Sequence, residues 1–277
     1  MRICSQLSLY LGLISAALAS PLWGDEPLPS GDSQAVEVPE GPITFRRDVV
    51  ALVLPRETKI DFATGSFCRL SGSHYLLTTA HFAVSRERGM VAVYSRGSSE
   101  GGKIQITEIA EDGAEWQHFP DVDLSAIKLR NDHEILERVV VRKLPSPLPR
   151  SPLAVLAPVR LIGVPLLYGV SERTGVNATV VRTEIANATV HLARSRPPVY
   201  LLMLPIDLPA GFSGGVVVDA PDPVKPAPPA DEEQTLRGII VKNTTDEKGG
   251  QFSVAVPAEV ISRLLSEAST LPPGDDK

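Results

Sequence analysis

The sequence carries a histidine, an aspartate and a serine in settings that suit nucleophilic catalysis. His81 follows Thr-Thr-Ala at the end of an apolar run, Asp123 directly precedes another apolar run, and Ser213 lies within Gly-Phe-Ser-Gly-Gly. A serine hydroxyl needs an adjacent base to become a good nucleophile. Histidine can accept that proton and return it to a leaving amine, while a carboxylate fixes the tautomer of the imidazole. Together the three residues predict acyl transfer at Ser213.

The glycines around Ser213 suit the same chemistry. Glycine lets the backbone approach a substrate closely and adopts turn conformations that other residues avoid. Such a turn can direct amide N–H groups at the oxyanion that develops on a scissile carbonyl. We therefore take the N–H groups of Gly211 and Ser213 as candidates for an oxyanion hole.

The order of the three residues carries more weight than any one of them. A histidine beside a strand, an acid at a strand end and a glycine-rich turn are each common structural features. Here the histidine comes first, the aspartate 42 residues later and the serine 90 residues after that. This is the order of chymotrypsin-like enzymes, whereas subtilisins and α/β-hydrolases use other orders.

The motifs Thr-Ala-His, Asp-x-Asp-Leu and Gly-x-Ser-Gly-Gly resemble those of the trypsin-like serine peptidase family. Within that family the sequence most resembles the bacterial HtrA/Deg-type protease domain. Residues 159–165 and 238–257 are similar to that family as well, and the resemblance covers about residues 45–266. It implies an all-β fold of two perpendicular, six-stranded antiparallel β-barrels, with a C-terminal helix and the active site between the barrels. It also implies a protein or peptide substrate and neither cofactor nor metal.

Two departures from the family change what is expected. In its zymogens a new N-terminus pairs with an acid just before the nucleophile, but Phe212 holds that place here, and its side chain forms no ion pair. We therefore expect no activation through a new N-terminus. HtrA-like proteins usually carry a C-terminal PDZ domain; only eleven residues follow Ser266, so we expect none.

Two further acids leave alternatives open. Asp121 lies close to Asp123, but the family's triad acid directly precedes the leucine, so Asp121 is expected to be solvated. Asp207 lies six residues before Ser213, the offset at which trypsin has the acid that selects Arg or Lys as the P1 residue. Because prolines flank Asp207, the loop need not align, and the alternative is a solvated loop acid.

Between the motifs, short apolar segments alternate with turns rich in glycine, proline and serine, which is typical of strands at hairpin spacing. A proline-rich crossing at 131–152 separates a first barrel, 44–130, from a second, 153–256; a helix is predicted at 257–266 and a solvated insertion at 221–233. The predicted strands are 49–54, 66–70, 74–78, 91–94, 103–109, 124–129, 154–156, 159–165, 178–185, 188–193, 199–204, 216–218, 237–242 and 252–256.

The N-terminus has the features of an export signal. Arg2 supplies a positive charge, an apolar run follows, and the Ala-Leu-Ala of residues 17–19 fits a cleavage site. We predict a signal peptide at 1–19, a proline-rich leader at 20–43 and a disordered tail at 269–277, hence a periplasmic or secreted protein. The alternative is an uncleaved N-terminal anchor. We expect no stable membrane span after cleavage, because no other segment is long and apolar enough.

Composition excludes some other functions. The net charge is -6 and no basic stripe is present, so nucleic acid is not an expected partner. After signal cleavage Cys68 is a single cysteine, which predicts no internal disulfide. A nucleophilic Cys68 is one alternative, but its alternating flanks favour a small buried residue in a strand. The remaining histidines lack metal-ligand spacing.

The sequence therefore predicts a serine endopeptidase in a domain at 44–268. Ser213 would form the acyl-enzyme, His81 would be the general base, and Asp123 would orient it. The alternative is a catalytically silent, protease-like module that binds peptides in the cell envelope. A third hypothesis is an enzyme whose oxyanion loop stays distorted until a partner binds.

Overall fold

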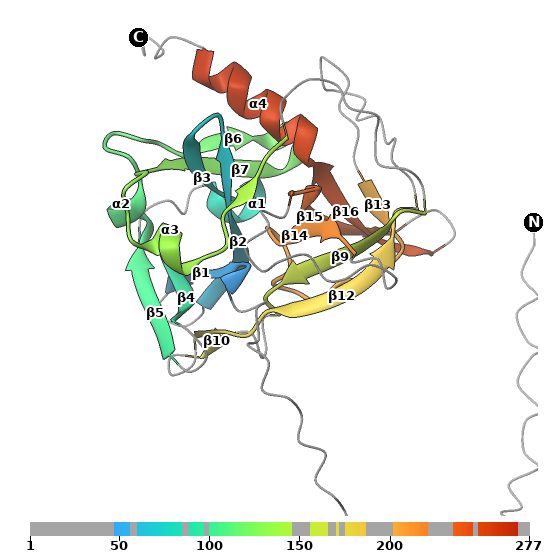
Figure 1. Cartoon of the computed structure of the whole chain (residues 1–277). Helices are drawn as coiled ribbons and strands as arrows, with labels where there is room; N and C mark the ends of the chain where they lie inside the picture. Colours follow the sequence, from blue (N-terminus) through green and yellow to red (C-terminus); the bar gives the residue numbers. More distant parts are fainter. Residues whose placement is uncertain are drawn as a thin grey trace, which may run out of the picture. The chain divides into compact units, whose positions relative to one another are not determined.

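Short strands separated by turns make up most of the chain that the structure describes (Figure 1). This structure is a computed structural model, and it describes residues 47–55, 60–84, 89–96, 100–145, 156–165, 170–171, 175–186, 202–220, 235–245 and 249–270. The predicted signal peptide and leader, the insertion at 221–233 and the strand at 188–193 lie outside the described residues.

The first sheet has the strand order β5-β4-β1-β2-β3-β7-β6, and β8 pairs with β2. Its strands are β1 (Val50–Pro55), β2 (Ile60–Leu70), β3 (Ser73–Thr79), β4 (Val91–Arg96), β5 (Glu100–Gln105), β6 (Gln117–Phe119), β7 (Leu124–Leu129) and β8 (Arg142–Lys143). Three one-turn helices interrupt this half: α1 (Ala80–Ala83), α2 (Ile106–Ile109) and α3 (Ile135–Arg138).

The hairpin from β2 to β3 shows how local sequence sets the register of this sheet. Its two turn residues, Ser71 and Gly72, have φ values of 51° and 86°. A two-residue turn with positive φ at both positions matches the right-handed twist of the flanking strands. The pairing of Leu70 with Ser73 follows from this turn, and with it the register of β3 against β2.

The second sheet has six strands in the order β12-β9-β14-β15-β16-β13, and β10 and β11 form a separate pair. Its strands are β9 (Pro158–Gly163), β12 (Thr179–Glu184), β13 (Leu202–Leu204), β14 (Val216–Asp219), β15 (Gly238–Thr245) and β16 (Gln251–Pro257); the pair consists of β10 (Val170–Ser171) and β11 (Gly175–Val176). The chain then forms α4 (Ala258–Thr270).

The expectation of an all-β fold with two β-sheet halves and a C-terminal helix is confirmed. The second sheet has the six strands expected, but the first has eight, because β6 and β8 are too short to leave a periodic pattern. The strand predicted at 103–109 stops at Gln105 and continues as α2. α4 extends to Thr270, four residues beyond the predicted helix, so the first two residues of the predicted tail, 269 and 270, are helical.

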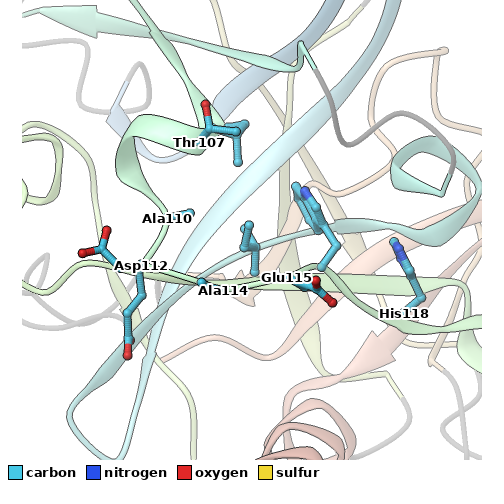
Figure 2. A pocket seen from close by; sticks show the side chains of 11 residues that line it. Thr107, Ala110, Asp112, Ala114, Glu115 and His118 are labelled. Carbon is cyan, nitrogen blue, oxygen red and sulfur yellow. The ribbon is translucent and has the colours of Figure 1, made fainter. Parts of the chain in front are cut away.

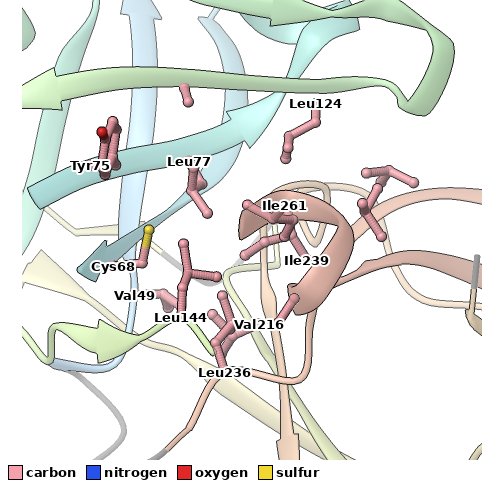
Figure 3. Close-up of a cluster of buried hydrophobic side chains, with 14 of the residues drawn as sticks. Val49, Cys68, Tyr75, Leu77, Leu124, Leu144, Val216, Leu236, Ile239 and Ile261 are labelled. Carbon is pink, nitrogen blue, oxygen red and sulfur yellow. The ribbon is translucent and has the colours of Figure 1, made fainter. Parts of the chain in front are cut away.

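Three clusters of buried apolar side chains hold these elements. One cluster consists of side chains from the first sheet and its neighbouring segments, and another of side chains from the second sheet and its neighbouring segments. The third contains side chains of both sheets and of α4, among them Leu77, Leu124, Ile239 and Ile261 (Figure 3). Its breadth joins the two halves through apolar burial, which is the main favourable contribution to folding.

Cys68 lies in this third cluster and is fully buried. Burial raises the pKa of its thiol well above the usual range, because desolvation disfavours the thiolate. The thiolate is the reactive form of cysteine. Cys68 is therefore a packing residue, and the alternative of a cysteine nucleophile is wrong.

A buried ion pair connects the start of the first sheet with β8. The Arg142 side chain is fully buried and its guanidinium contacts the Asp48 carboxylate and donates to the Asp48 carbonyl at 2.9 Å. Burial raises the pKa of the Asp48 carboxyl in spite of Arg142. The guanidinium of Arg142 therefore offsets part of the desolvation cost of the buried Asp48 carboxylate.

Among the described residues, no helix is both long and apolar enough to cross a membrane.

Candidate active site

His81 and Asp123 are in direct contact. The Nδ1 atom of His81 lies 2.8 Å from Oδ2 of Asp123, and the backbone N–H of His81 donates to Oδ1 of the same carboxylate at 2.9 Å. The His81 side chain is 54% exposed and that of Asp123 is 24% exposed. The carboxylate thus holds both the ring and the backbone of His81, while the ring stays exposed to solvent.

The register of β3 and β7 explains this contact. Thr79 at the end of β3 pairs with Leu124 at the start of β7, so β3 ends beside the point where β7 begins. His81 lies two residues after Thr79, and Asp123 directly precedes Leu124. The amide of Ala80 also donates to the Asp123 carbonyl at 3.0 Å. An antiparallel pair of strands therefore brings the two side chains together.

The backbone of Asp123 has a left-handed conformation, with φ 55° and ψ 39°. It ends a 3-10 helix at Pro120–Val122, and aspartate is one of the few residues that tolerate this region. Asp121 lies within that helical turn and is exposed. The structure thus brings Asp123, and not Asp121, to the histidine.

Ser213 lies in a tight loop that two glycines make possible. Gly211 has φ +100° and Gly214 has φ +89°, a region that favours glycine. A Cβ atom on Gly214 would lie 1.9 Å from the carbonyl oxygen of Thr64 and 2.9 Å from Oγ1 of Thr78. The loop therefore packs directly on β2 and β3, beside the segment that leads to His81.

Hydrogen bonds attach this loop to β2. The N–H of Thr64 donates to the Ser213 carbonyl at 2.8 Å, and the Thr64 hydroxyl donates to the Gly211 carbonyl at 2.6 Å. The Ser66 hydroxyl donates to the Gly214 carbonyl at 2.7 Å. A strand of the first sheet thus holds the carbonyls on both sides of Phe212 and Ser213.

The second sheet holds the other side of the loop. The Phe212 ring is buried in the apolar cluster of this sheet, in the space that the missing side chain of Gly163 leaves. The N–H of Gly214 donates to the Ile240 carbonyl at 2.7 Å. Phe212 is therefore an apolar anchor, at the position where the zymogens of the family have an acid.

Two backbone N–H groups in the Ser213 loop differ from those of their neighbours in their hydrogen bonding. The N–H groups of Phe212, Gly214 and Gly215 donate to backbone carbonyls at 3.4, 2.7 and 2.8 Å. Within the described chain, those of Gly211 and Ser213 have no acceptor. These are the two donors predicted for an oxyanion hole.

The third member of the predicted triad is not hydrogen-bonded to the other two. In the part of the chain that the structure describes, the Ser213 hydroxyl forms no hydrogen bond with the His81 ring. Catalytic hydrogen bonds are often long or poorly aligned when no substrate is bound. The arrangement is a formed histidine–carboxylate pair and a half-buried serine on the loop that packs against the adjoining strands.

Asp207 lies on the same loop, before Ser213, and is exposed. Its Oδ1 accepts a hydrogen bond from Nδ2 of Asn243 at 2.6 Å, and the same amide donates to the Leu208 carbonyl at 2.7 Å. The buried Ser253 hydroxyl lies 2.8 Å from Oδ1 of Asn243. The side chain of Asn243 thus bridges the loop and β16, and orients the Asp207 carboxylate.

A separate pocket of about 530 Å³ lies in the first sheet (Figure 2). Its lining includes the apolar residues Ile106, Ala110 and Ile127 and the acidic residues Asp112 and Glu115. None of the three predicted catalytic residues lines it. This pocket is therefore separate from the residues for which the sequence predicts chemistry.

The other described histidines have structural partners. Nδ1 of His118 lies 2.7 Å from the Ser125 hydroxyl, and Nδ1 of His74 lies 2.8 Å from Oδ1 of Asn131. Within the described ranges, no group of three or more metal-ligating side chains gathers.

Nothing in the sequence singled out Thr64, Ser66 or Asn243. Two hydroxyl residues that flank a glycine within a mainly apolar segment were a possible signal for Thr64 and Ser66. Asn243 stands out in the sequence only through the motif Asn-Thr-Thr, whose pattern points to glycosylation.

Solved structures share this fold. A serine endoprotease from Yersinia pestis matches with a TM-score of 0.51 and 18% identity, over 83% of this chain and 67% of that one. The HtrA-type protease AlgW with a tripeptide matches with a TM-score of 0.50 and 17% identity, over 81% of this chain and 61% of that one. Rv3671c from M. tuberculosis H37Rv, in an inactive form, matches with a TM-score of 0.51 and 14% identity, over 89% of this chain and 99% of that one.

These likenesses show that the chain has the trypsin-like fold found in HtrA-type serine proteases. The chain spans about three fifths of the length of AlgW. No protein-family model matches it. No curated protein matches it either.

Proposed function

We propose that this chain is a serine endopeptidase that hydrolyses peptide bonds through an acyl-enzyme on Ser213. The hydrogen bond of 2.8 Å between Nδ1 of His81 and the Asp123 carboxylate carries the proposal. A carboxylate on Nδ1 favours the tautomer in which Nε2 is the basic nitrogen. The protease-like fold and the loop position of Ser213 support the same assignment.

In the first half of the reaction the Ser213 hydroxyl attacks the scissile carbonyl. Its proton passes to Nε2 of His81, and Asp123 stabilises the imidazolium that forms. The carbonyl oxygen becomes an oxyanion, which the N–H groups of Gly211 and Ser213 stabilise. Both amides lack an acceptor within the described residues, so they can serve this oxygen without breaking another bond.

In the second half His81 returns its proton to the leaving amine, and the C–N bond breaks. An acyl group then remains on Ser213. Water attacks this ester with His81 again as the base, and the Ser213 hydroxyl leaves with the returned proton. The cycle restores the enzyme and needs no group beyond those named.

A fluorophosphonate probe tests the proposal, because it labels only an activated serine. We expect labelling of the full chain that is lost in Ser213→Ala and strongly reduced in His81→Ala. Absence of labelling, together with peptide binding, would favour the catalytically silent binding module. Labelling that appears only when a peptide is added would favour an oxyanion loop that orders on binding.

We also propose that the protein is exported and that residues 1–19 are removed. The positive Arg2, the apolar run and the small residues before Ser20 support this. Mass spectrometry of the protein from its native cells measures the N-terminus, and a chain that begins at Ser20 is expected. An intact Met1 on membrane-bound material would show an uncleaved anchor instead.

A further inference from the structure

Thr64 has an unusual place in the first sheet, because its three polar groups make four hydrogen bonds and three of these bonds lead to the other half of the chain. Its hydroxyl donates to the Gly211 carbonyl at 2.6 Å and accepts from the N–H of Val164 at 3.0 Å. Its own N–H donates to the Ser213 carbonyl at 2.8 Å, and its carbonyl accepts from the Thr78 hydroxyl at 3.0 Å. The residue is fully buried.

The carbonyl that the Thr64 hydroxyl holds lies between the two proposed oxyanion donors. The peptide unit from Gly211 to Phe212 separates the N–H of Gly211 from the N–H of Ser213. Gly211 has no side chain to limit its own rotation, and its φ is +100°. The angle between the two donors therefore depends on what fixes this peptide unit.

The other contact of this peptide unit is weaker. The N–H of Phe212 donates to the Pro209 carbonyl at 3.4 Å, near the limit for a hydrogen bond. The Thr64 hydroxyl bond is much shorter, and the Thr64 residue that donates it is fully buried. A hydrogen bond in such surroundings is stronger than one in contact with water.

We propose that Thr64 is a positioning residue that sets the orientation of the oxyanion donors through the Gly211 carbonyl. The inference rests on the proposed function, since it assigns a role within the same site. A strand of one sheet then controls the geometry of a loop that belongs to the other. Removal of the hydroxyl leaves both donors present but lets them turn away from the developing charge.

Ser95 offers a matched control. Its side chain is buried, and its hydroxyl also connects the first sheet to the second half of the chain, with bonds of 3.1 Å to the carbonyl and 3.0 Å from the N–H of Val176. Like Thr64, it donates to one carbonyl and accepts from one amide. These bonds do not involve the loop of Ser213.

The experiment compares Thr64→Val, Thr64→Ser and Ser95→Ala in the full chain, with a fluorogenic peptide that the wild type cleaves. We expect kcat of Thr64→Val to fall about 10- to 100-fold, less than the roughly 10²- to 10³-fold cost of removing an oxyanion donor itself, with KM within about twofold. Thr64→Ser keeps the hydroxyl and should keep kcat within about threefold. Ser95→Ala should lower the melting temperature without this loss of kcat.

A second readout separates positioning from general destabilisation. A peptide aldehyde forms a tetrahedral adduct with an oxyanion, whereas the same peptide ending in an alcohol does not. Binding of the aldehyde to Thr64→Val should weaken by about the factor lost in kcat, and binding of the alcohol should not change. If Thr64→Val does not fold, Thr64→Cys, which keeps a weak donor, replaces it in the same comparison and should lose kcat and aldehyde affinity together.

Unchanged kcat and aldehyde affinity in a folded Thr64→Val would overturn the inference while the proposed function stood. An equal loss in Ser95→Ala would also overturn it, because the effect would then be general. A wild type that neither cleaves peptides nor reacts with a fluorophosphonate would remove the proposed function and this inference with it.

Discussion

The two halves of the candidate active site are held in different ways. His81 and Asp123 lie just beyond the ends of adjacent strands of one sheet, His81 in α1 after β3 and Asp123 directly before β7, and their contact follows from the register of Thr79 with Leu124. Ser213 lies on a loop whose carbonyls are bound by β2 of the first sheet and whose Phe212 ring is buried in the second. The histidine–carboxylate pair is positioned by the pairing of two strands within one sheet. The Ser213 loop is positioned by contacts with both sheets.

Because of this difference, substitutions in the two halves of the site should have different effects on activity and on stability. A change in the histidine–carboxylate pair should affect chemistry without affecting the fold, because the ladder persists without it. A change at the loop should affect both, because the same contacts that orient Ser213 also join the sheets. The predictions below test this separation, beginning with the largest expected effect.

The largest effect is expected for Asp123→Asn. The amide would favour the wrong tautomer of His81, and kcat should fall by about 10⁴-fold with an unchanged melting temperature. Peptide cleavage and thermal unfolding measure the two quantities. Asp121→Asn is the control, since Asp121 is exposed in the same turn, and a comparable loss there would show that the wrong aspartate has been chosen.

Arg142→Met should have a large effect on stability and almost none on chemistry. It leaves the buried Asp48 carboxylate without its cation, which typically costs about 3–5 kcal/mol. Denaturant unfolding should show this loss, and adding Asp48→Asn should recover part of it. Below the melting temperature kcat should stay within about threefold; a larger fall would mean that the pair also supports the active site.

Gly214→Ala should reduce both stability and activity. A Cβ atom there would overlap the Thr64 carbonyl, and the positive φ is unfavourable for alanine. Because a displacement of about 1 Å can cost 10²-fold, we expect kcat to fall by about that factor. Gly249→Ala is the control, with a positive φ of 84° and open space around it. Similar activity losses in both variants would contradict the specific role of loop packing.

The smallest effect is expected for Asp207→Asn, which removes a charge but can keep the bond from Asn243. If the carboxylate selects basic residues at P1, cleavage after Arg or Lys should fall by up to about tenfold, which corresponds to about 1.4 kcal/mol. A peptide library measures this profile. A profile that does not change would make Asp207 a solvated loop acid, the alternative that the sequence left open.

Much of this arrangement could be read from the sequence where its cause is local. The apolar run after Asp123 is β7, and the glycines around Ser213 adopt the positive φ values that such a turn needs. The start of α4 follows Pro257 as its amphipathic pattern predicted. These features depend on residues within a few positions of each other.

The contacts that span the chain could not be read in this way. Thr64 and Gly211 are 147 residues apart, and no local pattern indicates that a strand hydroxyl will bind a loop carbonyl. The end of β5 at Gln105 was missed for a related reason, because the apolar residues Ile106 and Ile109 fit a strand as well as a helical turn buried in the first sheet.

The position of α4 also has a consequence for the order of synthesis. Ile261 of α4 packs in the cluster that includes side chains of both sheets, and the Ser262 hydroxyl donates to the Pro145 carbonyl in the crossing at 2.7 Å. Among the described elements α4 comes after every strand, so during synthesis it emerges from the ribosome after both sheets. A partly synthesised polypeptide would therefore lack the apolar contact of α4 with the cluster that joins the two sheets.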